Sequence, residues 1–230
     1  EYRYITLKSD KSHSVSGNIM SLTYGDDFED KLTIKNNYQY HSLFKSDTNL
    51  TDASELVLPA TTLANDCYSE MFNGCTSLTS APELPATTLA VECYDKMFYG
   101  CSALTTDPEL PATTLVSYCY QYMFYGCSSL TTAPELPATT LANYCYQHMF
   151  NGCTSLTTAP ELPATTITEY CYNGMFYGCT SLTTAPTTLP ATTLKVWCYT
   201  GMFNGCSSLT SAPELPAETL ANSCYREMYK

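Results

Sequence analysis

The chain has 230 residues, and its 22 acidic and 10 basic side chains give a net charge of −12. A charge of this sign repels nucleic-acid phosphates and anionic lipid headgroups, so nucleic acid is excluded as an expected partner. No apolar run approaches the roughly 20 residues of a transmembrane helix, and the first residues lack the pattern of a secretion signal. We therefore expect no transmembrane segment in this chain, and any signal or anchor segment to be absent from it.

The chain divides into a non-repetitive start and a repetitive remainder. Residues 1–37 are expected to form an N-terminal strand and capping segment, in which 19–24 show the loose alternation of a strand that covers the open end of a stack. Residues 38–230 are expected to form the solenoid, with a degenerate first coil at 38–62, regular coils at 63–219 and a partial last coil at 220–230.

Each repeat contains one short sequence motif. Leu-Pro-Ala-Thr-Thr-Leu, or a version with one substitution, begins at positions 58, 84, 110, 136, 162, 189 and 215, so the period is 26 residues with one of 27. A unit of this length cannot bury its own apolar face, and successive units must stack around a shared core. The sequence therefore predicts a solenoid.

Each unit contains two periodicities. Cys67, Tyr68, Met71, Phe72 and Cys75 are spaced like one face of a helix. The following residues, 77–81, are short, rich in Thr and Ser and stopped by a proline, as expected of a brief strand in a parallel ladder. We therefore predict an α/β repeat solenoid of short parallel strands and short helical arms.

A run within the unit resembles a known family. Met-Phe-Asn-Gly-Cys-Thr-Ser-Leu-Thr occurs at 71–79 and 149–157, is followed by Leu-Pro, and resembles the BspA-like leucine-rich repeats of bacterial surface proteins over residues 38–230. The unit is longer than the family's, and Ala stands in place of the strand Ile. The resemblance implies a right-handed leucine-rich-repeat superhelix, secreted or on a bacterial cell surface, that serves adhesion or binds host or microbial partners. It implies no catalytic residue and no cofactor.

Thirteen cysteines recur at two positions of the unit, and an odd number leaves at least one unpaired. One interpretation is two ladders of small, buried thiols. The alternative is a series of disulfides between coils, from Cys75–Cys93 to Cys206–Cys224. No metal site is expected, because Cys-x-x-Cys is absent and the three histidines lie at unrelated positions of the unit.

Positions that vary between near-identical units are expected to be exposed and to carry recognition. One such column is aromatic in four central coils, and two further rings lie one turn along. The candidate ligand-binding residues are Tyr118, Tyr144, Tyr170, Trp197, Tyr122 and His148. The alternative is that these rings only shield one another and the groove between coils. A secondary column contains Tyr99, Tyr125 and Tyr177.

Two other columns are more uniform. A row of threonines could form an ice-binding face only on a flat sheet, which a curved solenoid lacks. A row of glutamates forms an acidic edge that is either simply solvated or relieved by calcium.

Nearly every polar residue is one of six or seven copies, whereas catalysis needs a singular constellation, so we expect no enzyme. The predicted function is protein binding and adhesion at the bacterial cell surface, with a host extracellular or microbial surface protein as partner. The alternatives are a carbohydrate-binding solenoid with a glycan ligand, and a structural spacer.

Overall fold

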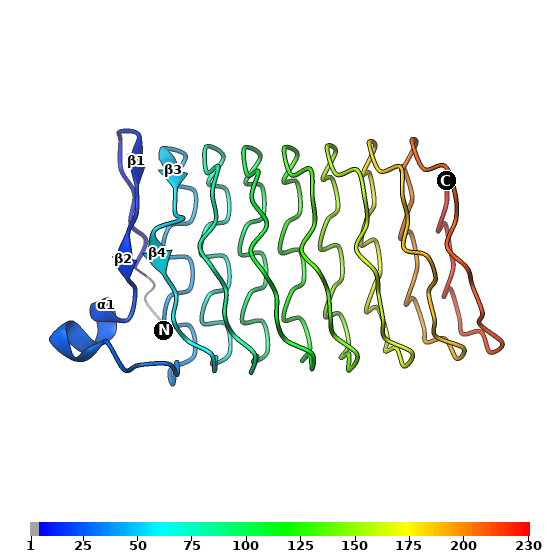
Figure 1. Ribbon diagram of the computed structural model, residues 1–230, viewed down its shortest axis with the longest axis horizontal. Helices are drawn as coiled ribbons and strands as arrows, with labels where there is room; N and C mark the ends of the chain where they lie inside the picture. Colours follow the sequence, from blue (N-terminus) through cyan, green and yellow to red (C-terminus); the bar gives the residue numbers. More distant parts are fainter. Residues whose placement is uncertain (1–4) are drawn as a thin grey trace.

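The computed structural model describes residues 5–230, which form a stack of coils along one long axis (Figure 1). The start and the end of the described chain lie at opposite ends of this stack. Each coil has a smooth arm at the front of Figure 1 and a zigzag arm behind it. The zigzag arm contains residues 64–75 and their equivalents, and the smooth arm contains residues 76–88 and their equivalents. The predicted repeat solenoid is confirmed.

The first residues pair with the first coil. Strand β1 (His13–Ser14) lies parallel to β3 (Leu50–Asp52), and β2 (Gly17–Asn18) lies parallel to β4 (Leu56–Val57). The blue segment at one end of Figure 1 shows this arrangement, with β1 and β2 on the outside of the stack.

The strand expected at 19–24 is wrong. Residues Ile19 and Met20 are both buried, and helix α1 (Ser21–Tyr24) and the 3-10 helix η1 (Gly25–Asp27) follow them. A strand would point adjacent side chains to opposite faces, whereas a turn of helix can bury neighbours together. The alternation of six residues was too short to distinguish the two structures.

The zigzag arms are runs of consecutive turns, so the predicted helical arms are also wrong. The backbone φ angle is positive at every fourth residue of the arm, for example 55° at Asp66, 56° at Glu70 and 78° at Gly74. A right-handed helix has no residue in this left-handed region. The arm exists where the sequence placed it, but its backbone is a series of turns.

Hydrogen bonds in the zigzag arm alternate between two directions. Met71 N donates to Tyr68 O within its own coil at 3.2 Å, whereas Tyr68 N donates to Cys93 O of the next coil at 3.0 Å. A helix would keep all these bonds inside one coil. Turns of four residues bury the same positions as a helix of 3.6 residues per turn, which is why the apolar spacing could not separate them.

The core contains two columns of stacked rings. The ring centroids of Tyr68 and Tyr94 are 5.8 Å apart, and those of Phe72 and Phe98 are 5.4 Å apart. These rings are buried, and each contacts its copies in the coils before and after. The buried columns are Tyr68, Tyr94, Tyr120, Tyr146, Tyr172 and Tyr199, and Phe72, Phe98, Phe124, Phe150, Phe176 and Phe203. Their large buried surface is continuous along the stack.

The cysteines form two ladders of free, buried thiols. In the second ladder each Sγ donates to a phenylalanine carbonyl of the preceding coil, as Cys101 does to Phe72 O at 3.1 Å and Cys127 to Phe98 O at 3.1 Å. Burial raises the pKa of Cys101 and Cys127 well above the ordinary thiol value. The structure thus agrees with the ladder interpretation and contains no disulfide between coils in residues 5–230.

The smooth arms pair as short parallel bridges. The predicted strand at 77–81 is represented by bridges such as Asp52–Ser80 and Thr158–Thr184. A second series, which the sequence did not predict, joins the Thr pairs after Leu-Pro-Ala, as in Thr114–Thr140. The hydroxyls of the outer threonine row donate to the preceding coil, for example Thr183 Oγ1 to Thr157 O at 3.1 Å.

A serine-to-glycine pair tests the turn structure. Ser223 has a φ of 55°, so Ser223→Gly should relieve left-handed strain and raise the free energy of unfolding by about 0.5–1 kcal/mol. Ser117 lies in an equivalent arm but outside the left-handed region, and it serves as the control. Ser117→Gly should lower the free energy of unfolding by about 0.5–1 kcal/mol. Urea unfolding of both variants measures the difference. A loss of stability in both would indicate that the arm is helical.

Thiol counting tests the cysteine ladders. The chain, purified without reductant and then denatured, should react with thirteen equivalents of a thiol reagent, because all thirteen cysteines are free. The folded chain should react very slowly, since burial keeps the thiols protonated. Two fewer equivalents for each bridge would demonstrate disulfides between coils.

Candidate binding surface

The left-handed residues of the zigzag arms align from coil to coil into two columns. The first left-handed column consists of Asp66, Glu92, Tyr118, Tyr144, Tyr170, Trp197 and Ser223. The second left-handed column consists of Glu70, Lys96, Tyr122, His148, Gly174, Gly201 and Glu227. The Cys, Tyr, Met and Phe positions of the arm face the core, whereas the side chains of these columns lie on the outside, where most of them are half-buried.

The structure brings four of the predicted site residues into one stack. Centroids of Tyr118 and Tyr144 are 4.7 Å apart with an interplanar angle of 8°, and those of Tyr144 and Tyr170 are 4.6 Å apart at 15°. Trp197 continues the stack at 5.9 Å from Tyr170. Because neighbouring rings cover one another's faces, the stack offers mainly ring edges and phenol oxygens to a partner.

A cation lies over the ring at one end of each of the two ring stacks. The Arg226 guanidinium lies 5.4 Å from the Trp197 ring centroid. In the second column the Lys96 ammonium lies 5.4 Å from the Tyr122 centroid, and His148 stacks on Tyr122 from the following coil at 5.1 Å. Each cation covers one terminal ring face of its stack.

The two remaining site residues are held by their neighbours. Asn151 Nδ2 donates to His148 Nδ1 at 3.0 Å, and burial lowers the pKa of His148 below the ordinary value. A Cβ atom added at Gly174 would lie 2.3 Å from the His148 ring, so this ring fills the space that a side chain at 174 would need. Glycine at 174 therefore makes room for His148.

The secondary column belongs to the same surface. Tyr99 and Tyr125 stack at 4.6 Å with an angle of 2°, and Tyr125 contacts Tyr122 at 5.9 Å. Tyr177 is 44% exposed. These tyrosines lie in one column in the sequence, as the first set does. Only the structure shows that the Tyr122–Tyr125 contact joins the second left-handed column to this one.

The first left-handed column begins with two carboxylates instead of rings. Burial and the neighbouring Glu92 raise the pKa of Asp66 to about 7. Close by, Asp95 is buried, and burial raises its pKa to about 6, although Lys96 Nζ donates to its Oδ2 at 2.6 Å. The aromatic surface is therefore bordered by carboxyl groups that titrate near neutral pH.

This surface has no evident catalytic chemistry. Within residues 5–230 there is no group of three His, Cys, Asp or Glu side chains that could hold a metal ion. The buried thiols are kept protonated by their raised pKa, which removes them as nucleophiles.

Across the described part of the chain, no helix is both long and apolar enough to cross a bilayer.

The Asp66 carboxyl predicts a pH dependence of stability. Its pKa is raised from 3.8 to about 7 on folding, so the folded chain binds more protons than the unfolded chain between these values. Stability should therefore fall as the pH rises from about 4 to about 7 and level off above 7. Asp66→Asn should flatten this decline and raise the unfolding temperature at pH 8. Glu83→Gln, which alters an exposed carboxylate, is the control and should leave the slope unchanged.

Three solved structures are similar to parts of this chain. Among solved structures, a leucine-rich repeat protein of T. pallidum is 20% identical, with 78% of this chain and 72% of that chain covered and a TM-score of 0.49. A leucine-rich repeat protein of Bacteroides ovatus is 20% identical, with 65% and 46% covered and a TM-score of 0.31. A leucine-rich cell surface protein of Faecalibacterium prausnitzii is 15% identical, with 74% of each chain covered and a TM-score of 0.27.

A search of curated proteins gave no match to this chain. The model of the BspA type leucine-rich repeat region matches residues 38–183 and 131–225, with six copies of the repeat. These matches cover most of the chain and include every aromatic residue of the candidate surface. The chain therefore belongs to the BspA type leucine-rich repeat family.

Proposed function

We propose that this chain is a non-enzymatic binding protein of a bacterial cell surface, and that its aromatic surface contacts a host extracellular or microbial surface protein. The observation that carries the proposal is the continuous stack of Tyr118, Tyr144, Tyr170 and Trp197 on the outside of a regular scaffold. Family membership supports a repeat-based interaction or surface protein.

The ring geometry favours a protein over a glycan. Sugars stack on the faces of aromatic rings, whereas neighbouring rings and the Arg226 guanidinium cover most of the ring faces in this column. Ring edges and phenol hydroxyls instead suit carbonyl oxygens and the faces of a partner's aromatic rings. Tyrosine and tryptophan are also enriched among the residues that dominate protein interfaces.

The rings are held in place before a partner arrives. Each is fixed by its neighbours in the stack and by a backbone whose alternate N–H groups bond to the next coil, for example Tyr122 N to Gln147 O at 2.9 Å. Less side-chain entropy is then lost on binding. This preorganisation supports a binding surface rather than a simple spacer.

Replacement of the stack tests the proposal. Tyr118, Tyr144, Tyr170 and Trp197 should be changed together to glycine, which tolerates the left-handed backbone and occurs naturally at 174 and 201. The control variant changes Thr79, Thr105, Thr183 and Thr210 to alanine on the smooth arm. Both variants and the parent chain are applied to an array of extracellular-matrix proteins, serum proteins and glycans, with circular dichroism as the check on folding.

The expected result is a protein hit whose affinity falls by about tenfold or more in the glycine variant and is unchanged in the threonine variant. Equal affinity of parent and glycine variant would remove the aromatic surface from the function. Saturable quenching of Trp197 fluorescence by an oligosaccharide would favour the glycan alternative. Silence of the parent chain on the whole array would favour the spacer.

A further inference from the structure

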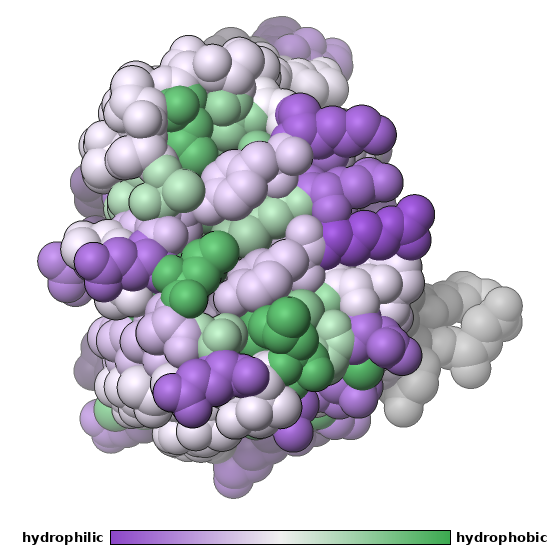
Figure 2. Space-filling view, turned by 90° about the vertical axis from the view of Figure 1, so that its right-hand side faces the viewer, coloured by the Kyte–Doolittle hydropathy of each residue, from purple (hydrophilic) through white to green (hydrophobic). Residues whose placement is uncertain are grey.

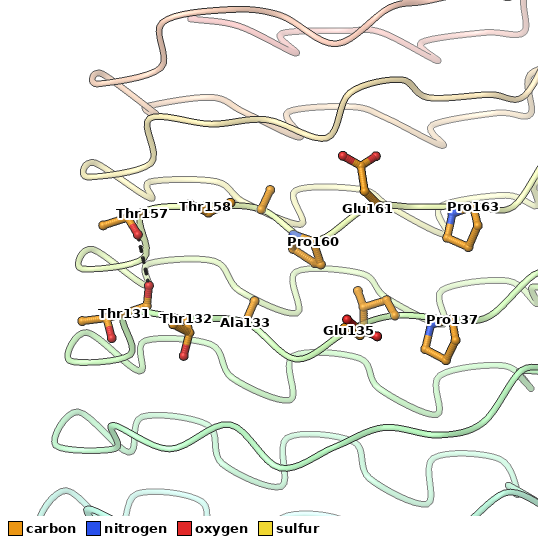
Figure 3. A pocket seen from close by; sticks show the side chains of 12 residues that line it. Thr131, Thr132, Ala133, Glu135, Pro137, Thr157, Thr158, Pro160, Glu161 and Pro163 are labelled. Carbon is orange, nitrogen blue, oxygen red and sulfur yellow. Dashed lines mark hydrogen bonds between the residues drawn. The ribbon is translucent and has the colours of Figure 1, made fainter.

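A groove crosses three coils on the smooth arm, away from the aromatic surface. Figure 3 shows the part of it that is lined by residues 131–137 and 157–163. It consists of two adjoining hollows of about 510 and 450 Å³. Both hollows are lined by Ala133, Glu135 and Pro137, so they form one continuous depression. Residues 107–111 lie at one end of it and residues 157–163 at the other.

The groove lies where the smooth arms form no parallel bridge, although Thr157 N still donates to Thr131 O at 3.3 Å. At this level of the coil, parallel bridges join Asp52 to Ser80 and Thr158 to Thr184, and within residues 5–230 none joins the coils between them. Two residues further along, bridged and unbridged coils alike have a proline, such as Pro134, which has no N–H group to extend a ladder beyond this level. A side-chain bond from Thr132 Oγ1 to Asp107 Oδ1 at 2.9 Å replaces the backbone pairing.

The lining combines apolar walls with carboxylates. Proline rings and Ala133 supply the apolar part, and each of the three coils contributes one glutamate, Glu109, Glu135 or Glu161. Figure 3 shows Glu135 and Glu161 side by side in consecutive coils, each close to the proline that follows it in the chain. All three glutamates are exposed.

Two of these carboxylates have no partner. Glu161 accepts hydrogen bonds from Thr187 N at 2.9 Å and from Thr187 Oγ1 at 2.8 Å. Glu109 and Glu135, in contrast, take part in none of the hydrogen bonds or ion pairs formed among residues 5–230. The groove therefore has fixed walls and two carboxylates free to contact a ligand.

The charge around the groove is entirely negative. No lysine or arginine occurs between Lys96 and Lys195, a stretch that contains Asp107, Glu109, Glu135, Glu161 and Glu169. Neighbouring coils lie about 5 Å apart, so adjacent glutamates repel each other by about 1 kcal/mol even in water. A cationic ligand would relieve this repulsion, and the apolar walls favour one that also carries apolar groups.

We propose that this groove binds an extended, basic segment of a partner protein, in which lysine or arginine side chains alternate with apolar ones. Three coils span about 10 Å, which corresponds to three or four residues of extended chain. In such a segment alternate side chains point to opposite sides, so the apolar residues meet Ala133 and the prolines while the basic residues reach Glu109 and Glu135. This site is separate from the aromatic surface.

The test uses a fluorescein-labelled peptide, Lys-Leu-Lys-Leu-Lys-Leu, and fluorescence anisotropy with the whole chain. Glu109→Gln with Glu135→Gln should weaken binding about tenfold or more, since two charge interactions are lost. Glu83→Gln with Glu214→Gln removes the same charge from the same row outside the two hollows, and should weaken binding less than about twofold. The glycine variant of the aromatic stack should bind the peptide like the parent chain, so this test is independent of the proposed function.

Three outcomes would overturn the proposal. Absence of peptide binding is the first, and equal weakening by both glutamine pairs is the second, since it would indicate general attraction to an acidic protein. The third is equal binding of Lys-Ser-Lys-Ser-Lys-Ser, because the apolar walls would then take no part. Since all four glutamates are exposed, neither glutamine pair should impair folding.

Discussion

In every zigzag arm except the last, alternate backbone N–H groups donate to the coil that follows, and the others close turns within their own coil. This ladder fixes the distance between coils, and nearly everything else in the protein repeats at that distance. The core tyrosines and phenylalanines stack at 5.4 to 5.8 Å because their backbones are held in register. The ladder of hydrogen bonds also requires a left-handed residue at every fourth position of the arm. The strain of this backbone conformation must be offset by the hydrogen bonds between coils.

The same register gives the two arms different surfaces. On the zigzag arm, side chains one coil apart are close enough for rings to stack face to face, which hides their faces and leaves edges outside. On the smooth arm, parallel bridges are missing beside two hollows, and one glutamate per coil borders these hollows. An edge-rich aromatic surface and an acidic groove suit different ligands, so one scaffold can present two chemistries.

Figure 2, which views the stack from its C-terminal end, shows apolar side chains at this end, where Leu215 and Leu220 are exposed.

Much of the candidate site was predictable from the sequence, because a column in a repeat alignment becomes a column in space. The predicted residues do lie together in stacks, namely Tyr118, Tyr144, Tyr170 and Trp197 in one and Tyr122 and His148 in another. Their role in binding is a proposal. The orientation of the rings was not predictable, since it depends on the left-handed backbone and on contacts such as His148 over Gly174. The missing bridges beside the groove were not predictable either. The same Thr-Thr-Ala-Pro sequence occurs where a bridge does form, at Thr158–Thr184.

The sequence by itself determined the solenoid, its period and the inward set of Cys67, Tyr68, Met71, Phe72 and Cys75, since a repeated apolar pattern has to be buried against its own copies. Only the tertiary structure decided that the arm is a series of turns rather than a helix. Both conformations bury the same residues, and the choice depends on hydrogen bonds to a neighbouring coil that lies 25 residues away along the chain, as from Tyr68 N to Cys93 O. A sequence pattern within one arm cannot predict these hydrogen bonds, because the acceptor lies in another coil and comes close only when the coils stack.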